Sequence, residues 1–123
     1  MRQRIGHLEF AVLFAALCVA DAWQLVQAAR GAHPDPPSLL VTHGATGLLA
    51  GAATIGAWRR RRWAVLAVLG WGAVTTAMLV ALGPVLDTPA AERPQLWVAA
   101  VVVASVASAT AWYLHRSARA PAP

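Results

Sequence analysis

Four consecutive arginines, Arg59, Arg60, Arg61 and Arg62, stand between Trp58 and Trp63, with an uncharged apolar stretch of span length on either side. Basic residues accumulate in the cytoplasmic connections of membrane proteins, and tryptophan is enriched where a span meets the lipid headgroups. The pattern therefore predicts two membrane helices joined by a very short cytoplasmic turn at the arginines.

The rest of the chain is also apolar. Hydrophobic residues make up 59% of its 123 residues and charged residues 12%, and the mean hydropathy is +0.56, which excludes an ordinary soluble domain. A membrane helix needs about 20 mostly apolar residues to cross about 30 Å of hydrocarbon. Stretches of that length are residues 5–29, 39–58, 63–86 and 95–114. We expect an all-α fold in which residues 1–123 form a single transmembrane domain, an up-down-up-down four-helix bundle, with a disordered cytoplasmic tail at residues 117–123.

The placement of the basic residues predicts the orientation. All ten cations are arginines, and the formal net charge is +5. Only Arg30 and Arg93 lie in the first and third connections; the others lie at the two termini or in the Arg59–Arg62 turn. With an even number of spans, both termini are expected in the cytoplasm. The positive net charge is explained by the membrane topology and by contact with anionic lipids. No nucleic-acid partner is expected, because no soluble fold presents the arginines beside stacking aromatics.

The chain has a four-span topology, an alanine-rich composition and a short apolar first helix after a basic start. In these features and in length it resembles small bacterial four-span proteins of the DoxX-like kind. The resemblance covers these general features and no sequence motif, so it implies the fold and no activity. The excess of alanine, arginine and proline, with no lysine, also favours a bacterial source. The expected location is the bacterial inner membrane.

The first apolar segment has an alternative interpretation as a cleaved signal peptide. Arg2 and Arg4 form a basic start, residues 10–20 an uncharged core, and residues 20–22 resemble a small-x-small cleavage site. The apolar pattern continues beyond that point, and bulky Trp23 would follow the cut. We therefore favour a retained first helix.

Asp21 is the strongest candidate for a functional residue, because an ionisable side chain inside a span is costly and usually has a role. At 1.5 Å per residue, Asp21 lies about 12 Å below the outer boundary of its span, and Thr46 and His43 lie about 10 Å and 6 Å below theirs. By the same rise, Thr75 in the third span and Ser105 in the fourth lie about 15 Å below the outer boundary. We predict an intramembrane polar cluster in the outer half, a candidate ligand or ion site, consisting of Asp21, Gln24, His43, Thr46, Thr75 and Ser105.

An acid beside an imidazole allows protonation to be coupled to the movement of a ligand or an ion. The alternative is an internal hydrogen bond from Asp21 to His43 or Gln24 that holds the helix register and performs no chemistry. The sequence leaves both interpretations open.

The remaining histidines suggest two weaker sites. His7 and His115 lie near the cytoplasmic ends of the first and last helices, where two imidazoles could supply both axial ligands of haem b. His33 and Asp35, with His43, make a loose metal site without fixed ligand spacing. Interfacial histidine is ordinary, so the expectation is no cofactor, with haem b as the alternative.

Four tryptophans at span ends are expected to anchor the bundle at the headgroups. Trp58, Trp63 and Trp112 fit the inner interface, together with the arginines of the turn, and Trp97 fits the outer one.

Small side chains are expected to line the helix contacts, because helices in lipid associate through close backbone approach and interhelical hydrogen bonds. The predicted packing positions are Gly44, Gly47 and Gly51 on the second helix and Ala104 and Ser108 on the fourth, with Gly72, Ala73 and Ala77 on the third. These stripes pack the bundle itself or receive a partner subunit.

Three function classes follow from these features. The sequence contains no nucleophile motif, phosphate loop or pair of catalytic carboxylates, so we expect no enzyme but a small accessory or structural subunit that packs against a larger membrane complex. The second class is a small oligomeric transporter or proton-coupled permeation protein that uses Asp21 and His43. The third is a redox protein that binds haem or quinone through its histidines.

Overall fold

The computed structural model describes residues 2–31, 37–85 and 89–119, and the elements that it shows in them are helices, with no strand. The helices are α1 (Arg2–Ala29), α2 (Pro37–Trp58), α3 (Ala64–Val85) and α4 (Arg93–Arg119). Each contains a segment long and apolar enough to cross a membrane: Gly6–Ala29, Leu39–Trp58, Ala64–Ala81 and Arg93–Arg119. The predicted all-helical architecture with four span-length helices is confirmed.

The C-terminal boundary differs from the expected one. Helix α4 continues to Arg119, and the hydroxyl of Ser117 donates a hydrogen bond to the carbonyl oxygen of Tyr113 at 2.9 Å. The disordered tail expected from residue 117 therefore does not begin there, since residues 117–119 are helical. Residues 120–123 lie outside the described residues, as do His33 and Asp35 of the loose metal site.

Helix α2 ends in an unusual turn. Arg60 has a φ of +53°, its N–H donates to the carbonyl of Ala57 at 3.2 Å, and the N–H of Arg61 donates to the carbonyl of Gly56 at 2.8 Å. These two bonds form a Schellman cap around a left-handed residue, a position usually taken by glycine, as Gly31 does after α1 with φ +72°. For arginine the left-handed conformation costs about 1–2 kcal/mol.

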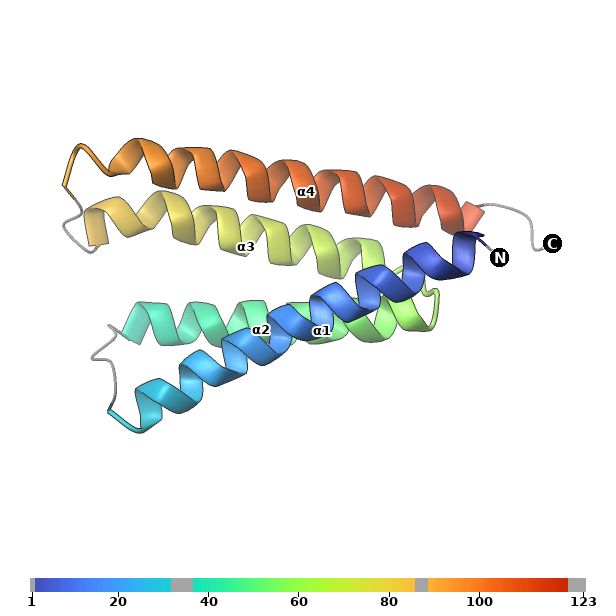
Figure 1. Ribbon diagram of the computed structural model, residues 1–123, viewed down its shortest axis with the longest axis horizontal. Coiled ribbons are helices and arrows are strands. Elements are labelled where there is room, and N and C mark those ends of the chain that lie inside the picture. Colours follow the sequence, from blue (N-terminus) through green and yellow to red (C-terminus); the bar gives the residue numbers. More distant parts are fainter. Residues whose placement is uncertain (1, 32–36, 86–88, 120–123) are drawn as a thin grey trace.

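Each helix packs against the next along the chain, whereas α1 and α4 have little contact. The start of α1 and the end of α4 lie at the same end of the bundle as the α2–α3 turn (Figure 1). We call this the arginine end, because it carries residues 59–62. From there α1 runs obliquely across α2 and diverges from α4 (Figure 1).

Small side chains fill the interior and large apolar ones cover the outside. The buried core is mostly alanine: Ala50, Ala53 and Ala57 of α2, Ala64 and Ala67 of α3, and Ala107 and Ala111 of α4. Its largest contact joins the rings of Phe14 and Trp71, edge to face with 5.4 Å between centroids. Outside, Leu48 is 78% exposed and Leu66 is 72% exposed. This distribution suits helices that approach closely in lipid.

Candidate functional site

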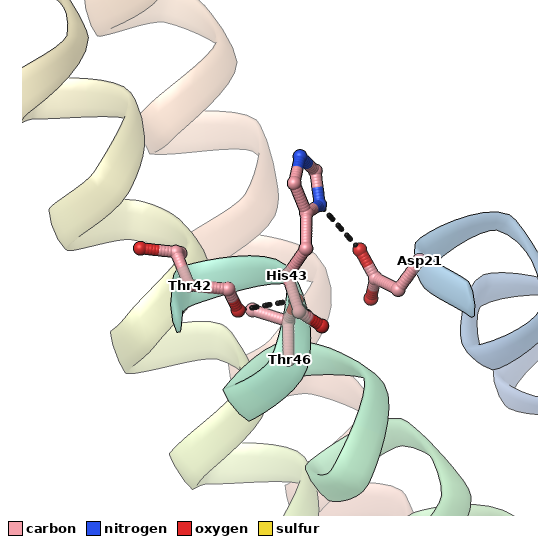
Figure 2. A network of polar contacts seen from close by, with 4 residues as sticks. All are labelled: Asp21, Thr42, His43 and Thr46. Atoms are coloured by element: carbon pink, nitrogen blue, oxygen red, sulfur yellow. Dashed lines mark hydrogen bonds and ion pairs between the residues drawn. The ribbon is translucent and has the colours of Figure 1, made fainter. Parts of the chain in front are cut away.

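The structure brings Asp21 of α1 and His43 of α2 together. Nδ1 of His43 lies 2.8 Å from Oδ1 of Asp21, and the side chains are 21% exposed for His43 and 16% for Asp21 (Figure 2). The imidazole is charged only when it is protonated, so the contact is a hydrogen bond that becomes an ion pair on protonation. The contact therefore joins α1 to α2.

Two glycines of α2 make this approach possible. A Cβ at Gly47, one turn after His43, would lie 3.2 Å from the Cβ of Asp21, and a Cβ at Gly51 would lie 3.5 Å from Sγ of Cys18. Both glycines therefore pack against α1. Gly44, the third predicted packing position on this helix, has no such contact, since a Cβ there would meet no described atom within 4 Å.

Thr46 is buried but bonds to its own helix. Its hydroxyl donates to the carbonyl oxygen of Thr42 at 2.9 Å and lies 3.3 Å from that of His43 (Figure 2). A threonine inside a helix commonly satisfies its hydroxyl in this way. Gln24 is exposed on α1. Neither side chain is hydrogen-bonded to Asp21 in the described part of the chain.

Thr75 and Ser105 do not join the pair either. Ser105 is exposed on α4, a helix that packs on α3. Oγ1 of Thr75 is buried without a hydrogen-bond partner among the described residues. The predicted six-residue cluster thus reduces to Asp21 and His43. Over residues 2–31, 37–85 and 89–119, no group of three or more His, Cys, Asp or Glu side chains is arranged to hold a metal.

A groove runs between α3 and α4. The Cβ of Ala107 lies so close to Gly72 that it leaves no room for a Cβ at position 72. Beside this contact lies a hollow of about 410 Å³. Small side chains from both helices line it, among them Gly72, Ala73, Thr76, Ala77, Ala104 and Ser108. The predicted small-residue positions of α3 and α4 therefore gather around a partly unfilled space.

Thr76 is a polar residue of this groove that the sequence prediction missed. Its Oγ1 is buried and has no hydrogen-bond partner in the described residues. The available signal was its spacing, because a residue four positions after Gly72 lies on the same helix face.

His7 and His115 face different spaces. His7 is buried, its ring centroid lies 6.1 Å from that of Tyr113, and it lines a cavity with Trp58 and Arg60. His115 is exposed and lines a separate, smaller cavity of about 90 Å³ on α3 and α4. Tyr113 and His115 are two residues apart, so they point about 200° apart around the helix axis. The fold therefore does not arrange these histidines as two ligands of one haem.

The four predicted anchoring tryptophans are exposed on the outside of the bundle: Trp58, Trp63, Trp97 and Trp112. The guanidinium of Arg116 lies 4.5 Å from the ring centroid of Trp112. Arg59–Arg62 are exposed as well. All these side chains are therefore accessible on the outer surface of the bundle.

Comparisons with protein-family models, with curated proteins and with solved structures find no match for this chain. The general resemblance to DoxX-like four-span proteins therefore has no family model in its support. The Asp21–His43 pair and the α3–α4 groove are the two features of the described residues that bear on a function.

Proposed function

We propose that the protein is a multi-pass protein of the bacterial inner membrane, with both termini in the cytoplasm. The support is the large apolar side chains on the outside, the exposed tryptophans and the collection of arginines at one end. A reporter that is active only in the cytoplasm, fused after residue 123, tests the orientation. Activity is expected there and not for the same reporter inserted between α1 and α2.

Within that membrane, the protein acts as a non-enzymatic accessory subunit that receives a transmembrane helix of a larger complex in the α3–α4 groove. The observation that carries this proposal is a groove of small side chains lined in part by Thr76, whose buried hydroxyl has no partner among the described residues. Small residues let a second helix approach closely, and hydroxyls bond across helices in lipid. A partner helix would fill the space, and rotation of the Thr76 side chain would let its hydroxyl donate to that helix.

The shape of the groove favours a different protein over a second copy. In a symmetric dimer the same patch of both copies meets itself. Two concave grooves would then face each other and neither would be filled. A convex helix face with larger side chains fits the groove better.

Ala77 offers a direct test, because it lines the groove and is exposed. Ala77→Leu should fill the space and abolish co-migration of a partner after mild detergent extraction from the native membrane, with the monomer still folded. Ala16→Leu, on an exposed face of α1, is the matched control and should retain the partner. A lone homo-oligomer, or a partner kept by Ala77→Leu, would contradict the proposal.

The Asp21–His43 contact favours a second candidate function, proton-coupled permeation. A half-buried acid bonded to an imidazole across two helices is a unit that can exchange a proton. Proton flux into vesicles containing the purified protein should fall to background in Asp21→Asn. If the wild-type flux equals that of protein-free vesicles, or if Asp21→Asn leaves it unchanged, the pair is structural.

A further inference from the structure

The arginine end contains a cavity that neither proposed function uses. It has a volume of about 400 Å³ and lies where the start of α1 meets the end of α2. Its lining combines His7 and Leu8 of α1 with Trp58 and Arg60 at the end of α2. A cation, an imidazole and two apolar side chains thus border one space.

His7 is buried in this wall, with 6% of its surface exposed. Its Nδ1 is buried and has no partner among the described residues. Nearly all buried polar atoms in proteins are hydrogen-bonded, so this nitrogen is an unused hydrogen-bonding group in a residue that lines the cavity.

Arg60 holds the left-handed position of the α2 cap, where glycine would complete the same two backbone bonds without strain. The cap places this arginine at the cavity wall, although the side chain itself remains exposed. A planar guanidinium matches the oxygens of a phosphate through two parallel hydrogen bonds. The strained backbone thus holds a phosphate-binding side chain at the cavity.

Trp58 and Leu8 add apolar surface next to that cation. Trp58 is 69% exposed and Leu8 is 48% exposed. A freely soluble phosphate compound has no apolar group to pack against this surface. In a phospholipid, by contrast, glycerol and acyl carbons lie directly beside the phosphate. Tryptophan in particular is enriched at headgroup depth.

We propose that this cavity binds the phosphate group of an anionic membrane lipid, with Arg60 and His7 at the headgroup and Trp58 and Leu8 against its apolar part. The proposal rests on membrane insertion but does not depend on which end of the bundle faces the cytoplasm. Nor does it depend on the partner or the transport activity proposed above.

Native mass spectrometry of the detergent-solubilised protein tests the site, with phosphatidylglycerol and phosphatidylcholine as probes. The wild type should retain phosphatidylglycerol about tenfold better, since a hydrogen bond to a charged group has an effect of that order. Arg60→Gln should remove the preference, and Arg60→Lys should restore part of it. His7→Phe should weaken retention severalfold.

Arg59→Gln is the matched control, because Arg59 belongs to the same turn and does not line the cavity. It should leave the preference unchanged within about twofold, well below the effect of a lost charged hydrogen bond. Equal losses in Arg59→Gln and Arg60→Gln would overturn the proposal, because they would indicate diffuse charge attraction. Displacement of the lipid by an equal concentration of glycerol phosphate would overturn the lipid assignment. Failure of the protein to sediment with alkali-washed membranes would instead refute insertion.

Discussion

In both the α1–α2 contact and the α3–α4 contact a glycine lets two helices approach closely. The two contacts differ in whether their polar side chains are hydrogen-bonded. In the first contact, Gly47 faces Asp21, which is bonded to His43. In the second, Gly72 touches Ala107, and the nearby hydroxyl of Thr76 has no partner among the described residues. Around Gly47 the polar groups of the α1–α2 contact are therefore bonded to each other, whereas around Gly72 the α3–α4 contact leaves an open space and a buried hydroxyl without a partner among the described residues.

The physical reason lies in the lipid. Apolar surface gains nothing by moving from lipid into a helix contact, so packing and interhelical hydrogen bonds decide which contacts form. An unpaired polar group in hydrocarbon finds no water to bond. A contact that satisfies its polar groups is therefore structurally closed, and one that does not is a candidate for a further partner.

The largest effect is expected at the close contact between Gly72 and Ala107. Gly72→Val should destabilise the protein by about 2–3 kcal/mol, because the new side chain must separate α3 from α4. The measurement is unfolding in mixed detergent micelles. Ala73→Val, directed into the groove, should have little effect, and equal effects in the two variants would show that the Gly72–Ala107 contact is loose.

The Asp21–His43 bond should contribute less. A double-mutant cycle with Asp21→Ala, His43→Ala and the combined variant should give a coupling of about 0.6–1.7 kcal/mol, the range found for interhelical bonds in membrane proteins. Unfolding of all four proteins in the same micelles provides the measurement. A coupling free energy of zero would show that the Asp21–His43 bond does not stabilise the protein. The α1–α2 contact would then not differ from the α3–α4 contact in this respect.

Two glycines on α2 distinguish the effect of close helix approach on stability from the effect of helix propensity. Gly44→Ala should stabilise the protein by about 0.5 kcal/mol, because alanine is the better helix former and the methyl group meets open space. Gly47→Ala should give no such gain, since the Cβ of Asp21 would lie 3.2 Å away and must shift. Melting temperatures of the two variants check this, and identical shifts would indicate that α1 and α2 are not in close contact at Gly47.

The smallest effect on stability is expected at Thr76. Thr76→Val removes an unpartnered hydroxyl at constant shape, so stability should change by less than about 0.5 kcal/mol. Retention of a co-purifying partner should nevertheless fall. Thr54→Val is the matched control, because that hydroxyl donates to the carbonyl of Ala50 in its own helix at 2.8 Å. Partner loss in both variants, or in neither, would argue against a role for the groove.

The sequence alone was sufficient for the four span-length helices, because their length and apolar composition need no tertiary information. It also placed Asp21 and His43 where their side chains could meet, since the rise of a helix is constant. The spacing of Gly47 and Gly51 placed both on one face. These properties depend on distance along the chain and on nothing else.

The tertiary structure decided which faces meet. It paired Asp21 with His43, turned Gly44 and Gln24 away from neighbours, and kept Ser105 on a helix that packs elsewhere. The reason is that the rotation of each helix about its axis, and its choice of neighbour, depend on packing against all the other helices at once. The same packing left the buried hydroxyl of Thr76 without a partner among the described residues, a feature that no local pattern contains.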